Sequence, residues 1–115
     1  MAAPNWRCAL TLATELLSQA KAHARIDHDD EDDTLTQMLA TALADVAHAA
    51  AYDLPATLAE LPADLAFAAC DQFSLLYDNR GGATERDRPL GLSLAASRIC
   101  ARYRGVSLGE PEVEA

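Results

Sequence analysis

Six of the seven residues from Asp27 to Asp33 carry carboxylates, which could bind a metal ion or a basic partner. These acids are Asp27, Asp29, Asp30, Glu31, Asp32 and Asp33. A calcium loop of the EF-hand type needs glycine at its sixth position and an acid at its twelfth. Counting from Asp27 places aspartate and methionine there, and counting from Asp29 places threonine and alanine. Neither register fits, so no specific calcium site is predicted.

The other residues that could do chemistry do not form a recognisable catalytic or metal-binding pattern. No two of His23, His28 and His48 have the spacing of four residues that places two metal ligands on one helix face. They are interpreted as surface histidines. No serine stands in a GxSxG motif, and Cys100, although it has arginines nearby, lies on an apolar stripe. We expect neither enzymatic activity nor a metal or cofactor.

The cysteines indicate a reducing environment. Cys8, Cys70 and Cys100 are an odd number at wide spacing, without a CxxC pair or a secretory leader. Cys70 and Cys100 stand among apolar neighbours, where a buried reduced thiol is usual. We expect a cytosolic protein without disulfides.

The acidic run must be held by the long helix that follows it. Apolar residues recur after it at helical spacing, which predicts a helix from Asp32 to Tyr52, the longest of the chain. They are Leu35, Met38, Leu39, Ala42, Leu43, Val46, Ala47 and Ala50. Asp30 is expected to cap this helix, with Asp33 as the acid of a capping box. Six acids exceed the need of one helix end, so the remainder serve either solubility or a partner.

The rest of the chain favours an all-α fold, a compact bundle of about four helices with a long connector loop and flexible termini. Residues 1–12 are predicted to be a flexible arm, 13–104 the helical domain and 105–115 a flexible acidic tail. Further helices are expected over 14–24, 63–78 and 91–102. Residues 53–62, with two prolines, form the connector. No segment has the alternating pattern of a strand or the apolar length of a transmembrane helix.

Charge is distributed unevenly along the chain. The formal net charge is −9, which argues against a protein whose main task is to bind nucleic acid. Residues 1–79 have a balance of −10, whereas residues 80–104 have a balance of +4. An acidic end and a basic end favour head-to-tail contact between copies. Alternatively, Arg98, Arg102 and Arg104 complement the C-terminal end of the last helix.

Four motifs in order resemble the phage gp6-like head-tail connector family, also described as head completion or adaptor proteins. The first, QAKAHARID over residues 19–27, is similar to the family's EAKAHLRID. The second is HDDEDD over 28–33. The third is LPADL at 61–65, leading to LYDNR at 76–80, and the fourth is PLGL at 89–92, leading to ARYR at 101–104. Arg102 stands where the family commonly has proline, so the last helix is expected to run further.

The resemblance implies a virion structural protein at the neck, present in the host cytoplasm before assembly. Such proteins form a ring of about a dozen copies beneath the portal, extend the DNA channel and dock the next tail or stopper protein. DNA would pass through without specific binding, and no membrane is involved. The candidate subunit-interface residues are Asp27, Asp29, Asp30, Asp32, Asp33, Arg80, Arg98, Arg102 and Arg104. Arg80 either stops its helix or bridges to a neighbour, and Trp6 is either a satellite of the core or an anchor into a partner.

A second class of function is a DNA-packaging protein similar in size to a small terminase subunit. It would need a basic recognition helix, and the last helix offers three arginines without an aromatic residue that could stack on bases. Salt-sensitive DNA binding by the isolated protein would favour this alternative.

Overall fold

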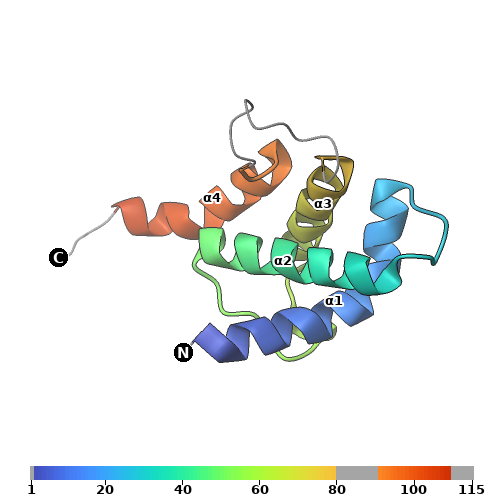
Figure 1. Ribbon diagram of the computed structural model, residues 1–115. Helices are drawn as coiled ribbons and strands as arrows, with labels where there is room; N and C mark the ends of the chain where they lie inside the picture. The colour runs from blue at the N-terminus through green and yellow to red at the C-terminus, as the bar shows by residue number, and fades with distance from the viewer. Residues whose placement is uncertain (1, 80–90, 110–115) are drawn as a thin grey trace.

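Four α-helices and one short 3-10 helix make up the fold in the computed structural model (Figure 1). The structure describes the backbone of residues 2–79 and 91–109, and the side chains of residues 6–79 and 91–103. The helices are α1 (Ala2–Ala24), α2 (Asp32–Ala50), η1 (Leu58–Glu60), α3 (Ala63–Asn79) and α4 (Leu94–Gly109). α1, α2 and α3 pack against one another, and α4 packs on α2 and α3. The all-α prediction is confirmed.

α1 is longer than the sequence pattern indicated. Residues 2–12, expected to be a flexible arm, form its first half, and its 23 residues make it longer than α2, with 19. The cause is an apolar stripe that continues towards the N-terminus: Ala9 and Leu12 are fully buried, in line with Leu16. Pro4 lies in the first turn, where the amide that proline lacks would have no intrahelical partner.

α2 buries the predicted stripe but begins differently from the expectation. Its N-cap residue is Glu31, so the capping box of Asp30 and Asp33 is wrong. The stripe itself is confirmed, because every member except the half-buried Met38 is buried.

α2 ends on a residue in an unfavourable backbone conformation. Ala51 has φ 54° and ψ 44°, the left-handed region, and the amide of Tyr52 donates to the carbonyl of Ala47 at 2.9 Å. A left-handed conformation costs an L-residue roughly 1–2 kcal/mol, whereas glycine adopts it freely.

We therefore expect Ala51→Gly to raise the free energy of unfolding by about 0.5–1 kcal/mol. Urea denaturation followed by circular dichroism measures it. The control is Ala49→Gly, two residues earlier inside the helix, which should lower stability by about 1 kcal/mol. Destabilisation by both changes would contradict the assigned cap.

The C-terminal half of the chain follows the prediction with shifted helix ends. α3 occupies almost the expected residues, whereas α4 starts at Leu94 instead of Gly91 and continues to Gly109. The expected extension past Arg102 is confirmed, and the first five residues of the predicted tail, 105–109, are helical. Residues 80–90 and 110–115 lie outside the described residues.

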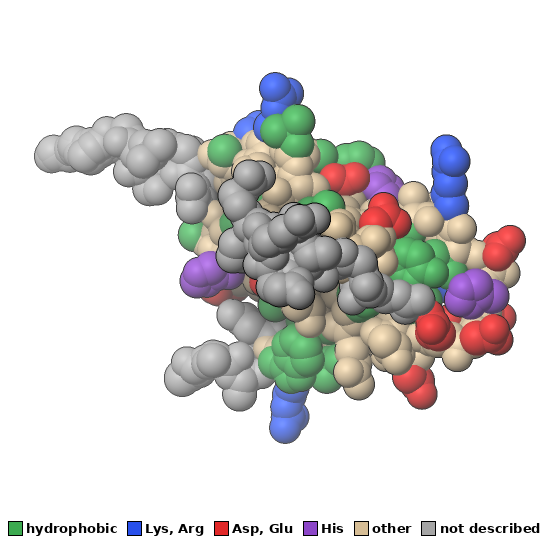
Figure 2. Space-filling view, turned by 45° about the horizontal axis from the view of Figure 1, so that its top comes forward, with side chains coloured by type: hydrophobic (Ala, Val, Ile, Leu, Met, Phe, Trp, Pro, Cys, Tyr) green, Lys and Arg blue, Asp and Glu red, His purple; other side chains and the backbone are tan. Residues whose placement is uncertain are grey.

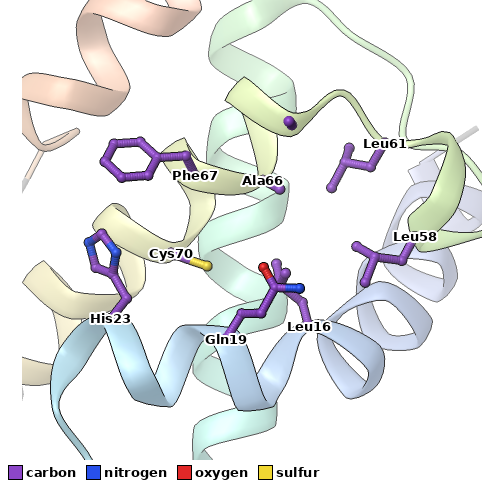
Figure 3. Close-up of a pocket in the computed structure, with 9 residues that line it drawn as sticks. Leu16, Gln19, His23, Leu58, Leu61, Ala66, Phe67 and Cys70 are labelled. Atoms are coloured by element: carbon purple, nitrogen blue, oxygen red, sulfur yellow. The ribbon is translucent and has the colours of Figure 1, made fainter.

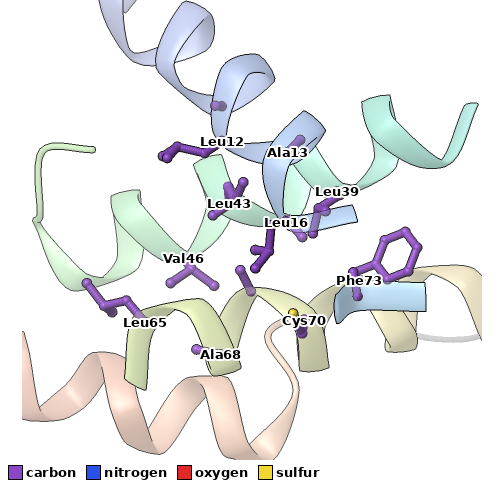
Figure 4. Close-up of a cluster of buried hydrophobic side chains, with 14 of the residues drawn as sticks. Leu12, Ala13, Leu16, Leu39, Leu43, Val46, Leu65, Ala68, Cys70 and Phe73 are labelled. Atoms are coloured by element: carbon purple, nitrogen blue, oxygen red, sulfur yellow. The ribbon is translucent and has the colours of Figure 1, made fainter. Parts of the chain in front are cut away.

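One apolar core lies where α1, α2 and α3 meet (Figure 4). Leu12 and Leu16 of α1 lie beside Leu43 of α2, and Phe73 of α3 is the largest of the fully buried side chains that the structure describes. Cys70 and Cys100 are buried, as expected, and all three cysteines are free thiols. Burial raises the pKa of the Cys70 thiol to about 11, so this thiol is protonated at neutral pH and acts as a packing group.

Candidate functional site

The acidic loop, residues 27–33, lies at one end of the molecule, between α1 and α2. Red side chains gather at that end in Figure 2, on the right, where Figure 1 shows the α1 to α2 connection. Asp27, Asp30 and Asp33 are exposed, and no hydrogen bond or ion pair holds them within the described residues. These three carboxylates are available to a partner.

Two other acids of the loop are held within the chain by Lys21 of α1. The Lys21 Nζ donates to Asp29 Oδ1 at 2.7 Å and to Asp32 Oδ1 at 2.8 Å. These hydrogen bonds raise the pKa of Lys21, and the bond from Lys21 lowers the pKa of Asp29. Asp29 and Asp32 thus have a local role, because they fix the acidic loop against the end of α1.

The basic residues of α4 also divide into two kinds. Arg98 is exposed and has no ion pair among the described side chains. Arg102 donates from Nη2 to Asp64 Oδ2 at 3.1 Å, so it is engaged within the chain. None of the arginines lies in the last turn of α4, so the interpretation that they complement its C-terminal end is wrong. The side chain of Arg104 and all of Arg80 lie outside the described residues.

Asp64 joins the start of α3 to α4 through a second bond. The Tyr103 hydroxyl donates to Asp64 Oδ1 at 2.7 Å, and the Tyr103 ring packs edge-on against Tyr52. The hydrogen bond from Tyr103 lowers the pKa of Asp64, and the carboxylate raises the pKa of Tyr103 to about 12. This contact holds the middle of α4 in place.

We expect Tyr103→Phe to cost about 1 kcal/mol of unfolding free energy at neutral pH, because it removes one partly exposed hydrogen bond to a charged group. A carboxyl whose pKa is lowered in the folded state stabilises above its unfolded value of 3.8 and loses that effect as pH falls through the folded value. The difference between the two proteins should therefore shrink in acid. Urea unfolding at several pH values measures it, with Tyr52→Phe as the control; a difference that does not change with pH would contradict this assignment.

His23 joins α1 to α3, which corrects its interpretation as a surface histidine. Its Nε2 lies 3.0 Å from Asp71 Oδ1, and its ring packs edge-on against Phe67 at 5.2 Å. Partial burial acts to raise the pKa of Asp71, but hydrogen bonds from Ser93 and His23 outweigh it and lower the value. His48 is exposed, as expected.

Gln72 was not among the predicted site residues, yet it is the polar residue buried in the described part of the core. Its Oε1 accepts the amide of Ser93 at 2.7 Å, and its Nε2 donates to the carbonyl of Gly91 at 3.1 Å. Ser93 in turn caps α4 by accepting the amide of Ala96 at 3.1 Å. The signal that could have identified Gln72 is its position on the same helix face as the apolar residues Leu65, Ala68 and Phe73.

Several hollows open on the described surface, and two of them are lined in part by α1. One, of about 320 Å³, lies between α1, η1 and α3; Figure 3 shows Phe67 and His23 on one side of it, Leu58 and Leu61 on the other. The second, of about 640 Å³, lies where the start of α1 faces the end of α2, and we call it the Trp6 groove. It is lined by Trp6, Ala44, Asp45, Ala47, His48, Ala51, Tyr52, Asp53 and Leu54. Trp6 is 44% exposed at its edge.

Neither hollow assembles a catalytic group. Across the described residues, no cluster of three or more histidine, cysteine, aspartate or glutamate side chains could hold a metal ion. None of the helices, within the same residues, combines the length and apolar character needed to cross a membrane. The arrangement offers surfaces for binding: an acidic loop, a mixed apolar and acidic groove, and an exposed arginine.

Comparison with known protein families matches residues 14–97 to the family described as phage gp6-like head-tail connector protein. The match runs from the second half of α1 to the first turn of α4, and therefore includes the acidic loop. No curated protein and no solved structure matches the chain.

Proposed function

This chain belongs to the phage gp6-like head-tail connector family, and from that premise we propose that it is a structural adaptor which forms a ring beneath the portal. The ring extends the DNA channel and docks the next tail or stopper protein. The family match over residues 14–97 is the observation that carries the proposal, because it covers all of α2 and α3 and reaches into α1 and α4. The working location is the virion neck, and free copies wait in the host cytoplasm.

The separation of charge on the surface supports assembly into a ring. A ring needs two different complementary patches on each copy, so that the contact is heterologous and closes on itself. Asp27, Asp30 and Asp33 are exposed between α1 and α2, whereas Arg98 is exposed on α4. α1 and α4 do not pack on each other, because α2 and α3 lie between them. Among the described side chains, these four are the interface candidates that the chain does not use internally.

The negative charge suits a channel wall that DNA slides past. With a net charge of −9 per copy, a ring of about a dozen copies carries on the order of a hundred negative charges before counterions. Such a field repels DNA and prevents adhesion to the bore. Acidic side chains turned wholly outward in the assembled ring, with arginines lining the bore, would refute this part of the proposal.

Binding to the cognate portal tests the proposal. We expect the purified chain to co-sediment with portal rings and to show no retention of duplex DNA at physiological salt. The same assay with Asp27→Asn, Asp30→Asn and Asp33→Asn combined asks whether the acidic loop meets the portal, with Glu60→Gln as an exposed acidic control. Salt-sensitive DNA binding without portal binding would favour the packaging alternative instead.

A further inference from the structure

The Trp6 groove combines apolar walls with two carboxylates. Trp6, Tyr52 and Leu54 supply apolar and aromatic surface, and Asp45 and Asp53 lie among them. No lysine or arginine pairs with either carboxylate within the described residues. Partial loss of hydration raises the pKa of Asp45, against the opposing effect of His48. A positive charge placed in this groove would stabilise the ionised Asp45 carboxylate and so compensate for its partial loss of hydration.

The first two turns of α4 offer the complementary surface. Leu94 is 75% exposed, the most exposed of the large apolar side chains that the structure describes. Arg98 follows four residues later, so the two side chains share one face of the helix. That face points away from the core, where Ala96, Ile99 and Cys100 are buried. A leucine beside an unpaired arginine matches a groove that is both apolar and acidic.

Leu94 and Arg98 do not line the groove of their own molecule, although α4 contacts the groove residue Tyr52 through Tyr103. The groove lies where the start of α1 faces the end of α2, and α4 packs on α2 and α3 without contacting α1 (Figure 1). A contact that places Leu94 and Arg98 in the groove would therefore join two copies. Because the two patches differ, a row of copies joined by this contact has a free groove at one end and a free α4 face at the other. These two free patches can bind each other and close the row into a ring.

We propose that the Trp6 groove receives Leu94 and Arg98 of a neighbouring copy, and that this contact joins the subunits of the ring. The Arg98 guanidinium enters between Asp45 and Asp53, where it can also stack on an aromatic face of Trp6 or Tyr52. Leu94 covers the apolar wall. This inference rests on the proposed function. It replaces the acidic loop by Asp45 and Asp53 as the partner of Arg98, so Asp27, Asp30 and Asp33 are left to face the portal or the bore.

The single tryptophan of the chain makes the contact directly measurable. Trp6 fluorescence is recorded against protein concentration, alone and with the cognate portal, alongside sedimentation velocity. We expect emission to move to shorter wavelength as copies associate. Arg98→Glu should weaken self-association by about tenfold or more, and Asp45→Arg combined with Asp53→Arg should do the same. Arg25→Glu, an equal charge change at an exposed site just after the C-terminal end of α1, should leave association unchanged.

Mixing the two defective variants distinguishes this contact from a symmetric one. The Arg98→Glu copy keeps an intact groove and the other variant keeps an intact arginine, and the two altered patches also carry opposite charges. The mixture should therefore form alternating assemblies larger than dimers, although each variant alone should not. Putting all three substitutions in one chain exchanges the charges and should restore larger assemblies. Circular dichroism of each variant checks that it folds.

Several outcomes overturn the inference. They are a ring in which Trp6 emission does not shift, full association of the Arg98→Glu variant, a mixture of the two variants that stops at dimers or does not associate, or contact of the portal with Trp6 on single copies. A ring that forms with the groove empty contradicts this inference alone. A chain that does not bind portal contradicts the proposed function. A chain that remains monomeric both at high concentration and with portal overturns this inference as well.

Discussion

Replacing Phe73 by alanine is expected to lower the free energy of unfolding by about 3–5 kcal/mol. Phe73 is fully buried between the helices and stacks on Tyr77 with ring centroids 6.4 Å apart. Much of the surrounding core is alanine, which contributes little apolar area per residue, so the loss of one large side chain leaves a cavity that small neighbours cannot fill. Urea denaturation followed by circular dichroism measures the change.

The other phenylalanine of the chain is the matched control. Phe67 lies on the same helix, six residues earlier, but is 49% exposed at the edge of the hollow beside η1. Phe67→Ala should cost about 1 kcal/mol or less, since most of the lost surface is already in water or packs only on His23. Equal losses for the two substitutions would contradict the assigned orientation of α3.

Replacing Gln72 by leucine is expected to cost about 2 kcal/mol, the second largest effect. The substitution keeps the volume but removes two hydrogen bonds and leaves the Ser93 amide without its partner in a partly buried site. The loss should be concentrated at the start of α4, because Gln72 holds the residues on which that helix begins. Hydrogen exchange should therefore accelerate in α4 more than in α1 or α2.

Gln37→Leu is the control for this experiment, because Gln37 is exposed on α2 and its replacement should change stability by less than about 0.5 kcal/mol. If the Gln72 anchor positions α4 as described, the same variant should also weaken self-association, since Arg98 and Leu94 lie just beyond it. Uniform acceleration of exchange across all helices would contradict a local role for Gln72.

Much of the fold follows from local patterns that the sequence displays. The stripe of α2, from Leu35 to Ala50, is buried as predicted, and α3 lies within one residue of its predicted end. The start of α1 was missed because Pro4 and a polar neighbourhood suggested an arm, whereas Ala9 and Leu12 extend the buried stripe. The helix end at Ala51 gave no signal, since a left-handed cap is typically glycine or asparagine.

The candidate site was less predictable, because its contacts join distant residues. The acidic run was identified from the sequence. The hydrogen bonds that Lys21 donates to two of its carboxylates depend on how the end of α1 lies beside the loop. Arg102 and Arg98 were predicted to share one role. The packing of α4 on α3 distinguishes them, because it pairs Arg102 with Asp64 and leaves Arg98 exposed without such a partner. Trp6 was recognised as a possible anchor, whereas the groove it lines includes residues more than forty positions away.

The central claim is that this connector protein acts by fitting against the portal and against copies of itself. Electron microscopy of the purified chain mixed with its cognate portal tests it most directly. We predict a closed ring of about a dozen copies seated beneath the portal and coaxial with its channel. Portal particles that remain bare at saturating concentrations of the chain would contradict the account.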